Sequence, residues 1–479
     1  MMKFRALRPA LLALALAGCA VGPDYHEPSV KLPSRWSEAP ADSEPALETP
    51  SRWWTVFADP ELDSLIDRAV RANLDVQSAE ARVREARAER TIAAAPFWPQ
   101  ATASGEYTRS KQSVNAAGGS GPSGSAGARS FGPSNLYQAN FDATWEIDVF
   151  GGTRRSVEAA SADIDASIDD RGAVLLTLLG DVARNYIELR GFQRQLEVSR
   201  SNLAAQKDTL DLTQARYQGG VAADLDVAQA EAQLETTASN IPTLEISAAQ
   251  AVHRLGVLLG ESPGTLADEL SESRPIPAAP SELPPGLPSD LLRQRPDVRR
   301  SERQLAAATA NIGVATADLY PKFSLLGTAG LSSISASDFL GGGSKLWSIG
   351  PSITWPVFQG GQIVANIEVS DAQAQQALLA YRQTILIALE DVENAIVEFS
   401  QERDRREKLA EAAKSNQRAV DHATALYTRG LTNFLNVLDA QRNLYQTESD
   451  LAQSETSVST DLVALHKALG GGWDVFPMP

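Results

Sequence analysis

Residues 136–149 read Leu-Tyr-Gln-Ala-Asn-Phe-Asp-Ala-Thr-Trp-Glu-Ile-Asp-Val, and their alternation decides the fold. From Tyr137 to Val149 every odd position is apolar, and every even position between them is polar or charged. A period of two places successive side chains on opposite faces of a strand. The stretch therefore predicts a β-strand with one apolar face and one face in contact with water.

Three further segments, 100–109, 322–332 and 346–358, show the same alternation, the first of them most weakly. All four have about the 9–11 residues that a tilted strand needs to cross a bilayer. Aromatic residues suited to the girdles at the two membrane interfaces are Tyr107, Tyr137, Trp145, Trp347 and Trp355. A soluble β-sandwich is the alternative, but the strands form two well-separated hairpins, each flanked by long helical sequence.

A sheet of four strands is not stable by itself in lipid. An open sheet has two edges without hydrogen-bond partners, and each unpaired amide there costs roughly several kcal/mol in a membrane. The sheet must close, and four strands are too few to close by themselves. We therefore expect a trimeric 12-stranded β-barrel, four strands per chain, with a water-filled interior lined by the polar faces.

The chain is an internal duplication. A shift of 210 residues superimposes the later part of each half, and a shift of 222 superimposes the earlier part. Two long repeats indicate two structural halves of one body. The predicted halves are 61–261 and 289–470, joined by a Pro-rich linker at 262–288. The linker, the segment 19–60 and the tail 471–479 should form an equatorial belt.

Long helices follow each hairpin. Within the predicted helix 154–218, an apolar or aromatic residue recurs every seven residues without a break from 175 onward: Leu175, Val182, Leu189, Leu196, Leu203, Leu210 and Tyr217. Such a repeat indicates helices that supercoil against partners. The second copy spans 362–428, and its heptad is broken at Arg406 and Ala413. Shorter helices are predicted at 61–95, 224–258, 289–319 and 434–468, which completes a mixed α and β membrane protein with a long α-helical coiled-coil barrel.

The start of the chain resembles a secretory signal. Three basic residues precede a short apolar run that ends at Leu16-Ala17-Gly18-Cys19. This ending resembles a bacterial lipobox, which predicts a signal peptide at 1–18 and a covalent lipid on Cys19. An ordinary secretory signal is the alternative. Ala20 after the cysteine favours the outer membrane, with the chain lipid-anchored and extending into the periplasm.

Charge and composition exclude several functions. Without the basic residues of the signal, the chain has 40 basic and 60 acidic residues, a net charge of −20, which argues against nucleic-acid binding. Cys19 is the only cysteine, and the four histidines are scattered, so no metal site is expected. The Gly-rich string 119–124 lacks the strand-to-helix context of a nucleotide site. We expect no enzyme and no cofactor besides the lipid.

At this point the chain resembles the outer-membrane factors, the TolC-like family, and within it the lipoprotein channels of the NodT/OprM type. The resemblance rests on the lipobox, the duplicated plan and two turn motifs, 215–220 leading into 225–227 and 425–430 leading into 435–441. It implies a homotrimeric exit channel of a tripartite efflux pump, with a periplasmic adaptor (membrane fusion) protein, an inner-membrane pump and outer-membrane lipid as partners. Two alternatives are the exit channel of a protein-secretion system and a periplasm-spanning structural lipoprotein without a pore.

The resemblance also implies roles for single residues. Gly219, Gly220 and Gly430 would form the hairpin tips that contact the adaptor, and Asp224 and Asn433 could cap the following helices. In the periplasmic gate, Leu435 would form an apolar ring, Asp439 an acidic ring and Arg442 an ion pair. Tyr427 would link the hairpins, with Asp226 as a polar partner. Asn436 departs from members with a second aspartate there. The alternatives are core packing for Tyr427 and a surface pair for Asp439 and Arg442.

Overall fold

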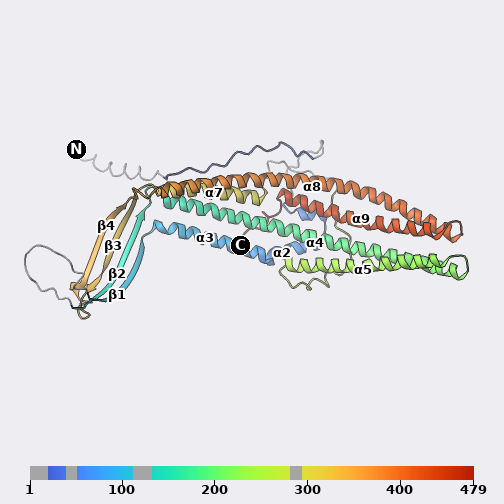
Figure 1. Cartoon of the computed structure of the whole chain (residues 1–479), viewed down its shortest axis with the longest axis horizontal. Helices are drawn as coiled ribbons and strands as arrows, with labels where there is room; N and C mark the ends of the chain where they lie inside the picture. Colours follow the sequence, from blue (N-terminus) through green and yellow to red (C-terminus); the bar gives the residue numbers. More distant parts are fainter. Residues whose placement is uncertain (1–19, 39–50, 112–131, 281–293, 479) are drawn as a thin grey trace, which may run out of the picture. The chain divides into compact units, whose positions relative to one another are not determined.

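The computed structural model describes residues 20–38, 51–111, 132–280 and 294–478 (Figure 1). Cys19 and the expected signal peptide lie outside these ranges. The chain divides into two compact units, one built from 1–27, 85–164 and 303–378 and the other from 28–84, 165–302 and 379–479. Each unit takes segments from both sequence repeats. The predicted repeats, 61–261 and 289–470, are therefore not the compact units, because the two copies interleave in space.

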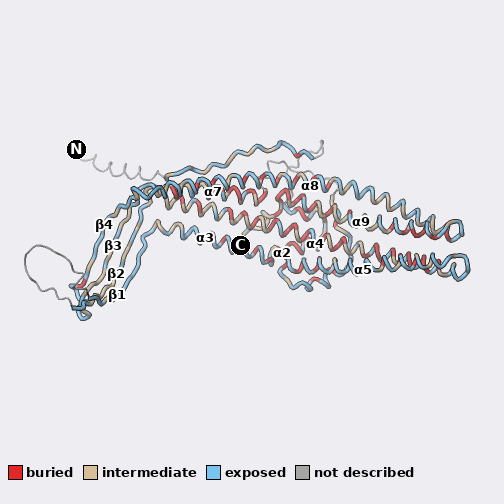
Figure 2. The backbone as a smooth tube through the Cα atoms, viewed as in Figure 1, coloured by how far each residue is buried: buried red, intermediate tan, exposed pale blue. Residues whose placement is uncertain are grey.

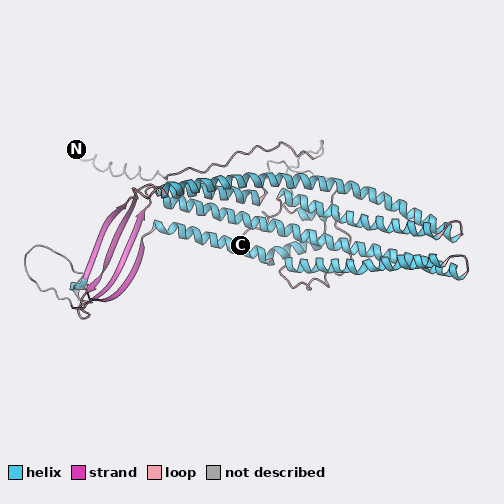
Figure 3. Cartoon of the chain, in the orientation of Figure 1, coloured by secondary structure: helices cyan, strands magenta, loops and turns pink. Residues whose placement is uncertain are grey.

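The first unit contains one four-stranded antiparallel sheet (Figure 3). Its strands, in sheet order, are β1 (Gln100–Ser110), β2 (Ser134–Ile147), β3 (Lys322–Ser333) and β4 (Lys345–Thr354). The pairing of β2 with β3 joins the hairpin of one repeat to the hairpin of the other. The prediction of four strands per chain is confirmed.

Two strands end earlier than predicted. β2 stops at Ile147 and not at Val149, because Asp148 turns to accept hydrogen bonds from the backbone N–H groups of Thr153 (3.2 Å) and Arg154 (3.0 Å). β4 stops at Thr354 and not at residue 358. β3 begins at Lys322, which lies opposite Thr354, so β4 has no residue of β3 to pair with beyond this point.

The register sorts the side chains of the sheet by polarity. Phe141 faces Ala103 on one side and Ala329 on the other, and Ala329 faces Trp347. One residue further along β2, Asp142 faces Thr328, whose hydroxyl donates to its carboxylate (2.8 Å). Phe141 and Trp347 are 70% and 77% exposed, and Figure 2 shows the strands largely free of buried positions. The chain alone therefore leaves an apolar sheet face uncovered.

Equivalent indoles join this sheet to the segments before it. The N–H of Trp145 donates to the carbonyl oxygen of Phe97 (3.0 Å), and that of Trp355 donates to that of Leu319 (3.1 Å). Trp145 and Trp355 correspond under the 210-residue shift, and Phe97 and Leu319 under the 222-residue shift. Both repeats thus fasten a strand end to the preceding helical segment in the same way.

Two helices of 67 residues belong to both units: α4 (Gly152–Gln218) and α8 (Gln362–Thr428). At 1.5 Å per residue each is about 100 Å long. They are followed by α5 (Asp224–Leu258) and α9 (Phe434–Leu469). The predicted bounds were 154–218, 362–428, 224–258 and 434–468. No helix in the described ranges is both long and apolar enough to cross a membrane.

The helices that precede the hairpins differ from the prediction. α7 is Pro296–Ala317 and not 289–319: residues 289–293 lie outside the described ranges, and proline is favoured in the first turn of a helix.

The structure has two helices where a single helix was expected at 61–95. They are α2 (Pro60–Ala72) and α3 (Leu74–Ala94). Asn73 separates them with ψ of 132°, and its side-chain oxygen accepts from the N–H groups of Asp75 (2.9 Å) and Val76 (3.1 Å). Such an asparagine starts a new helix. Three short 3₁₀ segments complete the described elements: η1 (Trp53–Phe57), η2 (Ala95–Phe97) and η3 (Gly342–Ser344).

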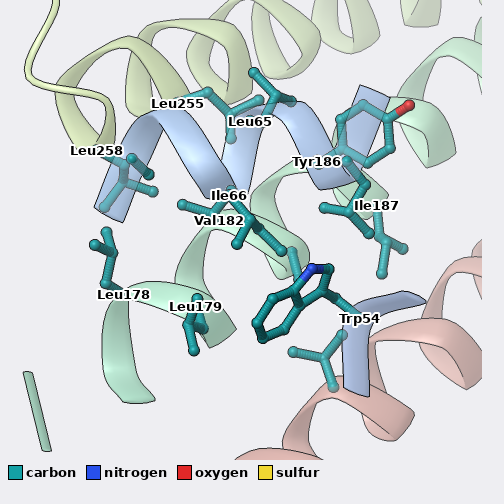
Figure 4. Packing of buried hydrophobic residues seen from close by; sticks show 14 of the residues in the cluster. Trp54, Leu65, Ile66, Leu178, Leu179, Val182, Tyr186, Ile187, Leu255 and Leu258 are labelled. Atoms are coloured by element: carbon teal, nitrogen blue, oxygen red, sulfur yellow. The ribbon is translucent and has the colours of Figure 1, made fainter. Parts of the chain in front are cut away.

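The main core lies in the second unit (Figure 4). Leu65 and Ile66 of α2 pack with Leu179 and Val182 of α4 and with Leu255 of α5, and all five are almost completely buried. Burying a leucine or isoleucine side chain contributes roughly 1.5–3 kcal/mol. This core fixes α2 and α5 to the heptad face of α4, as the unbroken seven-residue repeat predicts.

Candidate gate at the helical tips

Two tight turns in the second unit connect α4 with α5 and α8 with α9 (Figure 1). Gly220 and Gly430 have φ of +74° and +72°, a conformation that side chains with a Cβ rarely adopt. The N–H of Gly430 donates to the carbonyl oxygen of Tyr427 (2.9 Å), as that of Gly220 does to that of Tyr217 (2.9 Å). Gly219, before Gly220, donates to Ala215 (3.0 Å). These are helix C-caps that reverse the chain.

The two following helices begin differently. Asn433 caps α9, because its side-chain oxygen accepts from the N–H of Asn436 (3.3 Å). Asp224, expected as the cap of α5, is instead the first residue of that helix, and Ala223 stands at the cap position. Asp226 compensates by accepting from the backbone N–H of Ala223 (3.3 Å). The expectation for Asp224 was therefore wrong by one residue, since Asp226 can satisfy this donor from inside the helix.

A small apolar cluster holds the turns together. Its buried members come from all four helices: Leu210, Ala230, Tyr427, Phe434, Val437 and Leu438. The rings of Tyr427 and Phe434 lie 5.6 Å apart at 59°. The hydroxyl of Tyr427 is buried and has no hydrogen-bond partner among the described residues. Asp226, the polar partner that the resemblance implied, is occupied at the start of α5 instead.

The remaining predicted gate residues lie on the opposite face of α9. Leu435, Asp439 and Arg442 are exposed and follow one another at intervals of four and three residues, so they form one stripe along the helix. Leu435 is 48% exposed, whereas its neighbours Val437 and Leu438 are almost completely buried. Within one chain the side chains of Leu435 and Asp439 therefore stay exposed.

Arg442 has a neutral partner. Within one chain, its Nε donates to the side-chain oxygen of Gln233 on α5 (2.7 Å). The ion pair that the resemblance implies for Arg442 stays a prediction. A second polar contact, from the amide of Gln441 to the hydroxyl of Thr209 (2.8 Å), also joins α9 to the first hairpin. Neither of these two contacts is an ion pair.

The sequence analysis assigned no role to Arg216. In the structure this side chain reaches from the end of α4 to the end of α8. Its guanidinium lies 4.6 Å from the centre of the Tyr427 ring and donates to the carbonyl oxygen of Thr428 (3.1 Å). No local pattern could have revealed this contact, because it joins residues 212 positions apart.

No group of three or more metal-ligating side chains occurs in the part of the chain that the structure describes.

A sheet with bare edges and an uncovered apolar face, joined to helices that end in paired tips, defines a channel protein of the bacterial envelope. The family model described as "Outer membrane efflux protein" matches residues 65–261 and 287–471, once per repeat. The chain belongs to this family. It is an outer-membrane efflux channel protein, as the resemblance implied.

Individual relatives match almost end to end. Nodulation protein T of Rhizobium leguminosarum bv. viciae is 35% identical over 469 residues, covering 98% of this chain and 93% of the relative. The toluene efflux pump outer membrane protein TtgI of Pseudomonas putida is 30% identical and covers 99% of both chains. Among solved structures, the outer-membrane channel OprN is 35% identical with a TM-score of 0.86, covering 95% of this chain and 100% of OprN.

Proposed function

We propose that three copies of this chain form a passive exit duct of a tripartite efflux pump, which a periplasmic adaptor and an inner-membrane pump open at the helical tips. The observation that carries the proposal is the sheet. β1 and β4 are its edges, and one face exposes Phe141 and Trp347. In lipid such a sheet needs neighbours on both edges, which two further copies would provide.

The gate of this duct would be the stripe on α9. Three copies of Leu435 would narrow the entrance with apolar side chains, and three copies of Asp439 would make it favour cations. The tips at Gly219, Gly220 and Gly430 would contact the adaptor. The chain would perform no catalysis, since the partners supply the energy.

Small molecules are the favoured cargo. One relative is named for toluene efflux, and another, from Pseudomonas aeruginosa, for pyoverdine export. The exit channel of a protein-secretion system is the less favoured candidate. A structural lipoprotein without a pore is disfavoured because it has no need of a sheet with one polar and one apolar face.

Cys19 would carry the covalent lipid. Its replacement in Cys19→Ser removes the acylation site, and we expect sorting to the outer membrane to fall more than assembly does, because the strands themselves hold the protein in the membrane. Fractionation and native mass of the variant test this. Loss of the trimer in Cys19→Ser would contradict it.

The proposal is tested by recording ionic current through the purified full-length protein in planar lipid bilayers. A duct produces discrete conductance steps in the absence of any nucleotide, with a preference for cations. A preparation that inserts into the bilayer but never conducts, even when the adaptor and pump are added, would refute the duct.

A further inference from the structure

The four strands separate their charged residues by face. The register places the odd-numbered residues of every strand on the apolar face and the even-numbered residues on the polar face. All acidic side chains of these four strands lie on the polar face: Glu106, Asp142 and Glu146. The apolar face carries two charged residues in these strands, Arg109 and Lys345, and both are basic. An anion that approaches the apolar face therefore meets no acidic side chain of the strands.

Arg109 and Lys345 lie at the same end of the sheet. Arg109 is the second-last residue of β1 and Lys345 is the first residue of β4, so both lie at the hairpin ends of the strands (Figure 3). The opposite ends lead to helices, since β2 runs into α4 and β4 into α8. The helices of an outer-membrane efflux channel extend into the periplasm, so the two cations lie at the outer rim of the sheet.

Aromatic side chains indicate the depth of these cations in the membrane. Tyr107 precedes Arg109 by two residues and Trp347 follows Lys345 by two, so each ring lies next to a cation on the same face. The hydroxyl of Tyr107 donates to the side-chain oxygen of Asn135, the residue opposite Arg109 (3.1 Å). Such rings gather at the level of lipid head groups. Arg109 and Lys345 thus lie just beyond the aromatic side chains, at the head groups of the outer leaflet.

Both cations are available to a ligand. Arg109 and Lys345 are exposed, and neither side chain forms a hydrogen bond or an ion pair with a described residue. Lys322, the basic strand residue on the polar face, is instead paired with Asp318 (2.9 Å). Each lysine or arginine at a membrane surface attracts anionic lipid.

The shared barrel would bring the two cations together. Within one chain β1 and β4 are opposite edges of the sheet, three strand spacings or about 14 Å apart. In the trimeric barrel of the proposed function, β4 of one copy lies beside β1 of the next. Lys345 and Arg109 of two copies would then lie on neighbouring strands, roughly 5 Å apart across the barrel wall. Like charges at this spacing repel each other, and an anion between them offsets the repulsion.

We propose that Arg109 of one copy and Lys345 of the next bind the anionic head group of an outer-leaflet lipid at each subunit junction. The lipid is a glycolipid that carries phosphate groups on its sugars, as lipid A does. The guanidinium of Arg109 matches two phosphate oxygens, and Lys345 adds a point charge. The acyl chains would lie on the apolar face, along Trp347 and Phe141, which are exposed in one chain. The inference deepens the proposed function and rests on its trimeric barrel.

Native mass spectrometry of the full-length protein in a neutral detergent, titrated with diphosphoryl lipid A, tests the site. The unmodified trimer should bind up to three lipid molecules. Arg109→Gln and Lys345→Gln should each raise the apparent Kd about fivefold, and Arg109→Lys should raise it less. Lys322→Gln is the matched control, because it removes a strand cation from the polar face and should leave the Kd unchanged.

The same spectra separate the possible failures. Because they report the number of chains, a variant that no longer assembles is recognised, and the other single variant then carries the test. An unchanged Kd in the double variant Arg109→Gln/Lys345→Gln, or an equal loss in Lys322→Gln, would overturn the site while leaving the trimer intact. Displacement of lipid A by an equal concentration of inorganic phosphate would indicate a site for free anions and overturn the lipid. Single chains in the unmodified protein would instead overturn the proposed function, and the junction site with it.

Discussion

The carboxylate of Asp24 lies 2.6 Å from the guanidinium of Arg155, and this pair holds the segment 21–24 against the start of α4. Arg155 is only 5% exposed and also donates to the carbonyl oxygen of Val21 (3.2 Å). The N–H of Val21 in turn donates to the carbonyl oxygen of Phe150 (3.0 Å), between β2 and α4. The described residues that follow Cys19 are thus fixed where a strand passes into a helix.

Arg155→Ala should release this segment. Hydrogen exchange at the amide of Val21 should accelerate by about tenfold or more, because the segment loses its ion pair and two carbonyl contacts. Arg90→Ala is the control, since Arg90 donates to Ser161 of the same helix and does not touch the segment. Unchanged exchange at Val21 in Arg155→Ala would show that the Phe150 contact alone is sufficient.

Glu61→Gln should destabilise the second unit. Arg190 is completely buried, and Glu61 accepts from it as well as from Arg274 (2.9 Å) and the hydroxyl of Tyr186 (3.2 Å). Burial raises the pKa of Tyr186, so its hydroxyl stays protonated and remains a donor. Loss of the carboxylate leaves a buried cation uncompensated, at a cost of about 3 kcal/mol in the free energy of unfolding.

Denaturant unfolding followed by circular dichroism measures this cost. Glu197→Gln is the control, because Glu197 pairs with Arg194 (2.7 Å) in an exposed position. Such a pair contributes roughly 0–1 kcal/mol. Equal effects of the two substitutions would mean that the buried cluster is no more important than a surface pair.

The burial of His466 should make the free energy of unfolding decrease as the pH falls below about 6.5. Burial lowers its pKa from 6.5 to about 4, and both ring nitrogens are without partners among the described residues. The unfolded chain takes up a proton below about pH 6.5 and the folded chain does not. This contribution to stability is therefore complete above about pH 6.5 and decreases towards pH 4, by about 2 kcal/mol at pH 5.

His466→Phe tests this slope, since a phenyl ring can keep the stacking on Trp53, whose ring centre lies 5.2 Å away. The difference in unfolding free energy between the unmodified protein and His466→Phe should change between pH 7 and pH 5. His422→Gln, at an exposed position of α8, should leave the profile as it is. Parallel profiles for the unmodified protein and His466→Phe would contradict a neutral buried imidazole.

Asp439→Ala should reduce the preference of the channel for cations and loosen its closed state. The carboxylate is exposed on the α9 stripe, where three copies would converge at the entrance. Reversal potentials in a salt gradient measure the preference. Asn436→Asp adds an acidic residue near the same stripe and should shift the reversal potential in the opposite direction. Unchanged ion selectivity in Asp439→Ala would show that Asp439 is not part of the gate.

Much of the fold could be predicted because it depends on periodic patterns. The alternation around Phe141 predicted a two-faced strand, and the register places Phe141 beside Ala103 and Ala329. The seven-residue repeat through Leu175 and Val182 predicted a helix packed along its length, and both residues lie in the core. Such patterns extend over many residues, so a single exception does not hide them.

Single-residue events were harder to predict. Asn73 ends one helix and starts another by capping its own following backbone, a local effect that an apolar pattern running through it conceals. Arg216 reaches Tyr427 across the fold, and no spacing in the sequence encodes that contact. The pore roles of Leu435 and Asp439 stay predictions, since they concern surfaces that meet only between copies of the chain.

The mass of the membrane-extracted particle tests the account most directly. Light scattering with the detergent contribution subtracted gives the protein mass, and one chain of 479 residues has a mass of 51.2 kDa. The account predicts three chains per particle, which closes a twelve-stranded barrel. A particle with one chain, or a protein that leaves the membrane without detergent, would contradict the closed barrel and with it the duct.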